Sequence, residues 1–426
     1  MRALFFLLLV TSYLLTPQPV SAHAFGTLYT LPIPLWLYLF GAGAALIISF
    51  LLIGLFANES THVTIPKLNI KLNPSIIFLF KVISISLFIL TILTGFFGTQ
   101  SPVQNFAVNF FWIIFMLGFT YLTALLSDIW EIVNPWKIML SMFKELKPII
   151  SYPKSLGYFP ALFFYFILIW LELLSQGFAT RPQNLSLILL SYTTITILGA
   201  ILFGKEAWFK YGDFFSVFFK LIGNRSLSIT PHFSLLLFIL FMLSSTAFDG
   251  FRGTYLYFRY FFSFNPIVLL AASFILFLSL YLIAIFLMKL ITKSNFSIKA
   301  LSLQFAFSLI PIALAYNVAH YYTLLITQGQ QIIPLFSDPF NKGLNLFATA
   351  DYQINIGILN AGFIWNSEVV VIILGHIMAV VISHLIALKV FPKNQAMISQ
   401  IPMLILMVIY TITGLWILSQ PITSGL

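Results

Sequence analysis

Hydrophobic residues gather in ten long stretches of this chain, separated by short polar connections. An α-helix needs about 20 residues to cross the hydrocarbon core of a bilayer, and most of the stretches reach or approach that length. They cover residues 33–56, 76–97, 106–126, 159–174, 185–203, 233–248, 266–290, 301–326, 369–390 and 401–418. The pattern predicts an all-α polytopic membrane protein with about ten transmembrane helices in a single domain, residues 23–426.

Basic residues follow the same alternation as the predicted helices. The loops after the first, third, fifth, seventh and ninth helices carry 15 of the 21 Lys and Arg residues, the other loops carry 4, and Arg2 and Lys81 complete the set. Cytoplasmic loops are enriched in Lys and Arg. We therefore expect a multi-pass protein of the inner (plasma) membrane, with the mature N-terminus and the C-terminus outside the cytoplasm.

Residues 1–22 have the organisation of a secretory signal peptide. Arg2 supplies a positive charge, an apolar run follows over residues 3–15, and Val20-Ser21-Ala22 resembles a cleavage site. The apolar run is short for a membrane span. We predict cleavage after Ala22, and the alternative is an uncleaved eleventh helix.

Composition narrows the class of protein and its chemistry. Hydrophobic residues make up 60% of the chain, charged residues 8%, and the mean hydropathy is +1.02, which excludes a soluble globular protein. The net charge of +10 suits contact with anionic membrane lipids better than binding of nucleic acid. Because the chain has no cysteine, disulfides, thiolate nucleophiles and iron–sulfur clusters are excluded.

Two predicted cytoplasmic connections, residues 130–146 and 205–221, mix aromatic residues with lysines over a helix-length window. This pattern favours amphipathic segments that lie in the membrane interface. Their acidic residues are polar anchors at helix ends or, alternatively, catalytic groups. These residues are Asp128, Glu131, Glu206 and Asp213.

The residues best suited to bind a metal ion are predicted on the exterior side. Asn317 and His320 lie three positions apart on one helix face. Counting from the predicted outer helix ends, His320 and His376 lie at similar depth, roughly 9 to 11 Å inside. Ionisable groups inside a membrane are costly and indicate function. We predict that His320 and His376 bind a divalent metal ion, zinc, copper or iron, with Asn317 beside them.

His384 lies eight residues beyond His376, which corresponds to a rise of about 12 Å, too far for both to bind one ion. It either belongs to a proton path below the metal site or hydrogen-bonds another helix.

A loop of about 40 residues, 327–368, connects the helices that carry His320 and His376. Loops of this length without secondary structure are often functional. We expect it to fold back as a lid that brings Asp338 and Asp351 over the histidines, as catalytic groups and, for Asp351, as a metal ligand. Asp338 precedes a proline, so a structural turn explains it equally well.

Three further residues are secondary candidates. Asp249 and Glu172 lie near the outer ends of their predicted helices and can join the site or act as interfacial charges. After signal cleavage His23 would be the mature N-terminus, where its amine and imidazole together could bind copper. The alternative is an ordinary flexible terminus.

Short motifs along the chain resemble those of polytopic bacterial membrane proteins labelled fenitrothion hydrolase. The resemblance runs from His23 to about Leu388 and implies hydrolysis of an apolar phosphotriester. Relatives can have histidine where this sequence has Asn317, which removes one possible metal ligand here. The motifs are HAFG at 23–26, LPIP at 31–34, FDG at 248–250, NVAHYY at 317–322, SDPF at 337–340, TADY at 349–352, GH at 375–376 and SH at 383–384.

Two functions of different classes follow. The first is a metal-dependent hydrolase of apolar phosphotriesters or other esters, in which the metal ion activates water and a carboxylate acts as base. The second is a transporter of metal ions or protons, or a copper-handling membrane protein, with the histidines as steps along the path. A structural subunit of a membrane complex is a third possibility.

Overall fold

The computed structural model describes residues 20–21, 28–29, 31, 33–56, 73–143, 147–223 and 231–420. Nearly all regular structure in these ranges is helical, which confirms the all-α polytopic class. One short antiparallel pair joins β1 (Val20–Ser21) to β2 (Leu28–Tyr29). The predicted signal peptide, apart from residues 20–21, lies outside the described residues, and so does His23.

Several helix starts are encoded locally by an Asn-Pro pair. The side chains of Asn73, Asn134 and Asn265 each accept a hydrogen bond from a backbone N–H of the first turn, and proline follows each of them. Such N-caps satisfy a backbone donor that the helix leaves unpaired. Proline at the first helical position loses nothing, because its missing N–H would have no partner there.

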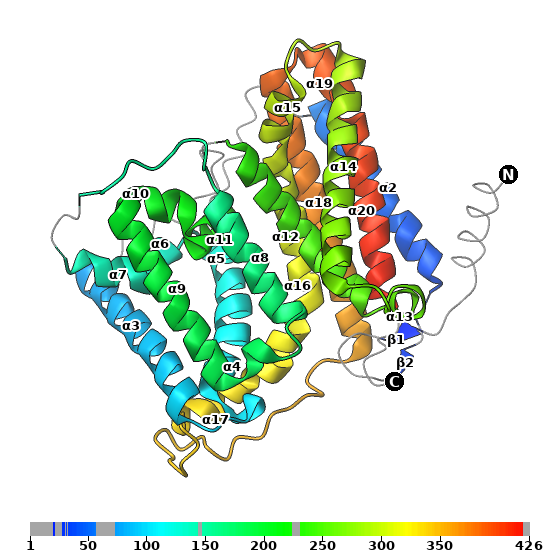
Figure 1. Cartoon of the computed structure of the whole chain (residues 1–426). Helices are drawn as coiled ribbons and strands as arrows, with labels where there is room; N and C mark the ends of the chain where they lie inside the picture. The colour runs from blue at the N-terminus through cyan, green and yellow to red at the C-terminus, as the bar shows by residue number, and fades with distance from the viewer. Residues whose placement is uncertain are drawn as a thin grey trace. The chain divides into compact units, whose positions relative to one another are not determined.

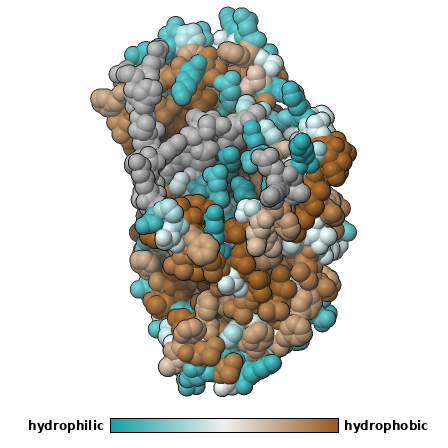
Figure 2. Space-filling model, turned by 90° about the vertical axis from the view of Figure 1, so that its left-hand side faces the viewer, coloured by the Kyte–Doolittle hydropathy of each residue, from teal (hydrophilic) through white to brown (hydrophobic). Residues whose placement is uncertain are grey.

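Nine helical stretches in the described ranges are long and apolar enough to cross a membrane. Each overlaps one of the ten predicted segments, and the tenth, 159–174, forms the 15-residue helix α8 (Phe159–Leu173). Figure 2 shows hydrophobic side chains over a broad area of one face, with hydrophilic side chains above and below it. The protein is therefore a multi-pass membrane protein.

The chain forms two compact units. Unit 1 contains the described residues within 1–62, 239–323 and 359–426. In it α2 packs along α18 and α20, and α14 packs along α20 (Figure 1). Its helices are α2 (Leu35–Phe56), most of α12 (Phe233–Arg252), α13 (Tyr255–Tyr260), α14 (Pro266–Thr292), α15 (Ile298–Phe305), η5 (Ala306–Leu309), most of α16 (Ile310–Thr327), α18 (Ala361–Val390), α19 (Lys393–Ser399) and α20 (Ile401–Leu418).

Unit 2 contains the described residues within 63–238 and 324–358. Here α3 packs against α9 and α4, and α11 packs against α5 and α8 (Figure 1). Besides α8, its helices are α3 (Pro74–Phe97), η1 (Pro102–Gln104), α4 (Phe106–Asn109), η2 (Phe110–Phe119), α5 (Thr120–Leu126), α6 (Trp130–Val133), α7 (Pro135–Ser141), η3 (Phe178–Thr180), α9 (Pro182–Phe203), α10 (Lys205–Ala207), η4 (Trp208–Gly212), α11 (Phe214–Gly223), η6 (Gln328–Gln331) and α17 (Ile332–Ser337).

The two segments expected to lie in the membrane interface help to build the interior of unit 2. Almost every residue of α11 is buried. Trp136 stacks on Phe215 with ring centroids 5.4 Å apart, and Asn134 donates a hydrogen bond to Ser216 over 3.1 Å. Most of the described aromatic residues of these segments therefore pack inside unit 2, whereas Phe143 is exposed, and the position of the segments relative to the membrane stays a prediction.

The connection predicted over residues 327–368 is more helical than expected. Residues 298–337 form one continuous helical stretch of 40 residues that ends with α17. The side chain of Asn360 caps the first turn of α18, which begins at Ala361, eight residues before the predicted start. The irregular part of the connection is therefore limited to residues 338–360.

Candidate functional site

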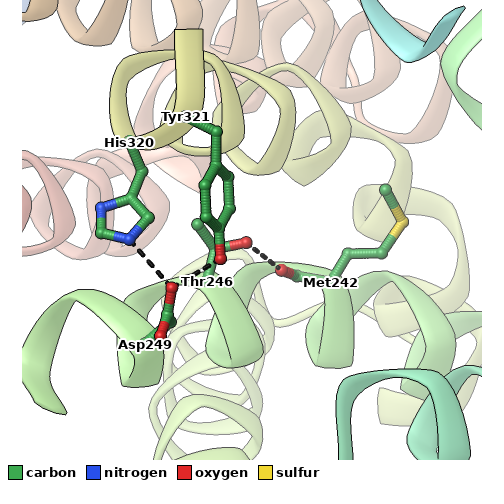
Figure 3. Close-up of polar contacts among 5 residues, drawn as sticks. All are labelled: Met242, Thr246, Asp249, His320 and Tyr321. Atoms are coloured by element: carbon green, nitrogen blue, oxygen red, sulfur yellow. Dashed lines mark hydrogen bonds and ion pairs between the residues drawn. The ribbon is translucent and has the colours of Figure 1, made fainter. Parts of the chain in front are cut away.

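Asp249 of α12 and His320 of α16 form the one ion pair that occurs among the described residues. Nε2 of His320 lies 2.9 Å from Oδ2 of Asp249, and Tyr321 donates its hydroxyl to the same oxygen over 2.5 Å (Figure 3). Because a carboxylate only accepts hydrogen bonds, Nε2 of His320 carries a proton in this contact. The side chains of His320 and Asp249 are 13% and 19% exposed, so water has limited access to the pair.

A glycine beside Asp249 allows α12 and α20 to approach closely. A Cβ atom at Gly250 would lie 2.8 Å from Cγ2 of Ile417 and 3.7 Å from Cε1 of His320. Thr246, one turn before Asp249, donates its hydroxyl to the Met242 carbonyl over 3.2 Å (Figure 3). A side chain at position 250 would therefore crowd Ile417 of α20, whereas its contact with the imidazole ring would be an ordinary van der Waals contact.

His376 lies in the middle of α18 and is completely buried. Its Nδ1 donates to the Ile372 carbonyl over 2.9 Å, and its ring centroid lies 6.0 Å from that of Tyr316. Within the part of the chain that the structure describes, its Nε2 atom has no hydrogen-bond partner. One imidazole nitrogen of His376 is therefore available to a ligand.

The contacts between α16 and α18 place the two histidines at different levels. Tyr322 lies beside Ser367, with 2.5 Å between their hydroxyl oxygens, and Tyr316 lies beside His376. On α18, the position opposite His320 therefore lies about six residues before His376. At a rise of 1.5 Å per residue, the two histidines are offset by roughly 9 Å along the helix axis. Equal depth was expected because α18 was predicted to begin eight residues later than it does.

Two more titratable groups of α18 are buried. Nδ1 of His384 accepts a hydrogen bond from Nε2 of Gln400 over 2.8 Å, while its own Nε2 has no partner among the described residues. Glu368 is 4% exposed, and its carboxylate makes no hydrogen bond to any residue that the structure describes. Glu368, His376 and His384 thus form a series of buried ionisable groups that turns by roughly 160° around α18 over 16 residues, and we call this series the α18 column.

Glu368 was missed from the sequence because the predicted helix began only at Val369. The signal that could have revealed it is Asn360, a favourable N-cap residue at the true start of α18. Asn317 lies half-buried on α16, one turn before His320, as its spacing predicts.

The two aspartates of the connection belong to unit 2, whereas the histidines belong to unit 1. The Asp338 carboxylate accepts hydrogen bonds from the backbone N–H groups of Lys342, Gly343 and Leu344 over 2.6 to 3.1 Å. This arrangement stabilises a turn after α17. Asp351 is exposed.

Glu172 lies exposed at the penultimate position of α8, also in unit 2. His23, the remaining candidate, is outside the described residues. No group of three His, Asp or Glu side chains within the described ranges could hold a metal ion.

Comparisons with known proteins add no relatives. No protein-family model, no curated protein and no solved structure matches this chain. The resemblance to fenitrothion hydrolases therefore stays a prediction.

Proposed function

We propose that unit 1 carries a small cation, a proton or a divalent metal ion, along the α18 column. The observation that supports this function best is the Nε2 atom of His376, which has no partner among the described residues and is unprotonated in the neutral ring because Nδ1 donates to Ile372. In His384 Nδ1 accepts from Gln400, so the unpartnered Nε2 carries the proton and can donate it onward. Protons and metal ions such as zinc and copper are the cations that a neutral imidazole nitrogen binds.

Burial of the α18 column lowers the stability of the folded protein, which argues against a purely structural role for these residues. Buried polar atoms are normally hydrogen-bonded, and a buried atom without a partner costs about 1–3 kcal/mol. Ionisable residues in membrane-spanning helices usually face a pathway or a partner. Three such buried residues along one helix, each rotated by about 80° from the next, therefore favour a shared task.

The length of the column suits passage through a membrane. Glu368 and His384 are 16 residues apart, about 24 Å along α18, compared with a hydrocarbon core of about 30 Å. The Asp249–His320 pair lies close to the level of Glu368 and would add groups at that end. Neighbouring ionisable residues of the α18 column are about 12 Å apart along the helix. Water molecules would therefore have to bridge the gaps between their side chains.

Flux into proteoliposomes tests this proposal. One set of vesicles contains a pH-sensitive dye and receives a pH gradient, and a second set contains a zinc-sensitive dye and receives external zinc. We expect protein-dependent flux of one cation and a loss of at least tenfold in both His376→Leu and His376→Gln. Leu374→Ala, a change at a lipid-exposed position of the same helix, serves as the control. Absence of both fluxes, or full flux in both His376 variants, would contradict the proposal.

The Asp249–His320 pair supports a second candidate, hydrolysis of an ester. A carboxylate that orients a histidine is the arrangement of a general base in many hydrolases. Nδ1 of His320 would take the proton from water, since Nε2 holds its proton against Asp249. The resemblance noted in the sequence suggests an apolar phosphotriester as substrate.

A bound catalytic metal ion fits this pair less well. Catalytic zinc sites normally have three protein ligands, and the described His, Asp and Glu residues do not form such a group. Hydrolysis of a phosphotriester and a carboxylic ester by purified wild type and Asp249→Asn tests the candidate. A rate at least tenfold lower in the variant would support it, and equal rates would exclude a role for the pair.

We further propose the orientation that the basic residues predict, with the C-terminus outside the cytoplasm. Because the chain has no native cysteine, single cysteines introduced at Gln420 and at Lys393 can be labelled in intact cells with an impermeant maleimide. Labelling at position 420 but not at 393 would support this orientation, and the reverse would invert it.

A further inference from the structure

Unit 2 contains two cavities of opposite character that share a wall at Trp130. The apolar cavity has a volume of about 190 Å³ and is lined almost entirely by aromatic and aliphatic side chains. The polar cavity has a volume of about 460 Å³, which is within the usual range for small-molecule sites. Six charged side chains line the polar cavity: Asp128, Glu131, Lys137, Glu206, Lys210 and Lys220.

The charges around the polar cavity do not neutralise one another by direct contact. No nitrogen of its three lysines lies within 4.0 Å of a carboxylate oxygen, since the one ion pair of the described residues is in unit 1. Oδ1 of Asp128 is buried, and it has no hydrogen-bond partner in the described ranges. Three positive and three negative groups therefore surround the space without direct ion pairs, although Lys137 and Lys210 lie over the rings of Phe209 and Tyr211.

Trp130 points to a ligand independently of these charges. Its side chain is only 4% exposed, and its indole N–H has no hydrogen-bond partner among the residues described. Buried indole N–H groups normally have an acceptor. A molecule bound in the polar cavity could accept the hydrogen bond from the indole N–H of Trp130.

Both cavities are also bordered by π-helical backbone. The segment η2 (Phe110–Phe119) contributes Phe111, Phe115 and Phe119 to the apolar cavity, and η4 (Trp208–Gly212) contributes Phe209 and Lys210 to the polar one. π-helices are rare and occur frequently at functional sites. Their presence at both cavities links the two spaces to one role.

The polar cavity combines positive and negative charge on partly exposed side chains. Burial, reinforced by nearby Glu131, raises the pKa of Asp128 to about 6, although Lys137 and Lys220 oppose the shift. Behind the cavity, burial also raises the pKa of Asp213, whose carboxylate accepts a hydrogen bond from Ser216 N–H. A ligand with an ammonium group would stabilise the charged form of Asp128, and a phosphate group would balance the positive charge of the lysines.

We propose that unit 2 binds one amphiphile whose zwitterionic phosphate–ammonium headgroup occupies the polar cavity and whose chain enters the apolar cavity. Lys137 and Lys220 would hold the phosphate, and Asp128 would accept a hydrogen bond from the ammonium. The headgroup must carry N–H donors, because a quaternary ammonium cannot satisfy Oδ1 of Asp128. Phosphatidylethanolamine has this chemistry.

Access to the apolar cavity is available from the lipid side. Phe80 and Ile83, which line this cavity, are 40% and 43% exposed, while Glu131, Glu206 and Lys210 at the polar cavity are exposed as well. A membrane lipid can therefore reach both spaces with its chain and its headgroup.

Native mass spectrometry of the full chain in detergent tests the proposal. Phosphatidylethanolamine, phosphatidylcholine and phosphatidylglycerol with identical chains are added separately at the same concentration. We expect phosphatidylethanolamine to bind at least tenfold more tightly than the other two. Equal binding of the three lipids, or tightest binding of phosphatidylglycerol, would overturn the assignment of a zwitterionic headgroup.

Two variants separate the headgroup from the chain. Asp128→Asn should remove the preference for phosphatidylethanolamine over phosphatidylcholine. Ile83→Trp should fill part of the apolar cavity and weaken binding at least tenfold, whereas Ile76→Trp, at a similarly exposed position of α3 outside the cavity, should not. Unchanged binding in both Asp128→Asn and Ile83→Trp, with gel filtration profiles like wild type, would refute the site.

Discussion

Asp249 accepts two hydrogen bonds through one oxygen atom, and this shared acceptor makes a quantitative prediction possible. His320 and Tyr321 donate over 2.9 and 2.5 Å to Oδ2. In Asp249→Asn an N–H₂ donor replaces one carboxylate oxygen, and the remaining oxygen is neutral. Hydrogen bonds to charged groups contribute about 1.5–3 kcal/mol each, and partial exposure of the pair favours the lower end of that range.

We therefore expect Asp249→Asn to lower the free energy of unfolding by about 2 kcal/mol, and Tyr321→Phe to lower it by about 1.5 kcal/mol. Because both changes remove the same contact, the double variant should lose about 1 kcal/mol less than the sum of the single changes. Reversible unfolding in mixed detergent–lipid micelles, followed by tryptophan fluorescence, measures all four free energies.

Tyr322→Phe is the matched control for this cycle. Tyr322 is adjacent to Tyr321 on α16, but its hydroxyl contacts Ser367 and the Ile364 carbonyl instead of Asp249. Its effect should add to that of Asp249→Asn within about 0.5 kcal/mol. Additive behaviour of the Asp249–Tyr321 cycle itself would show that the two side chains do not share a hydrogen bond.

Three further predictions follow from packing and charge. Gln400→Leu removes the hydrogen-bond donor to Nδ1 of His384 and should lower the free energy of unfolding by about 1–3 kcal/mol in the same assay. An unchanged free energy of unfolding would show that this hydrogen bond is absent. Gly375→Val should cost at least about 1–3 kcal/mol by overpacking, since a Cβ atom there would lie 2.3 Å from Cβ of Ala315; wild-type stability would contradict the close approach of α16 and α18. The pKa of Asp128 is about 6 in the folded protein, compared with an ordinary value of 3.8, so the folded state binds this proton more tightly than the unfolded state does. The contribution of Asp128 to the free energy of unfolding should therefore decline as the pH rises from 4 to 6, by at most about 3 kcal/mol. Asp128→Asn should remove this decline when unfolding is measured across that range, and identical pH profiles of the two proteins would refute it.

Chain length and local hydrophobicity determined the class of this protein and the positions of its long apolar helices. An apolar stretch of about 20 residues is long enough to cross a membrane as a helix, and helices cover all ten predicted segments, the shortest being α8. Local capping chemistry at Asn73, Asn134 and Asn265 likewise follows from the residues themselves. The start of α18 was predicted too late because a cap at Asn360 and a charge at Glu368 were taken as parts of a loop.

Tertiary structure alone decided which polar residues meet. Asp249 and His320 are 71 positions apart, and the sequence left open whether Asp249 joins the site or is an interfacial charge, whereas the structure pairs the two side chains. Helices such as α18 are apolar around their whole circumference, so hydrophobic periodicity does not show which face packs against a neighbour. Which residues face each other and at what level, such as His376 beside Tyr316, depends on the lateral packing of helices distant in sequence, and so does the burial of α11.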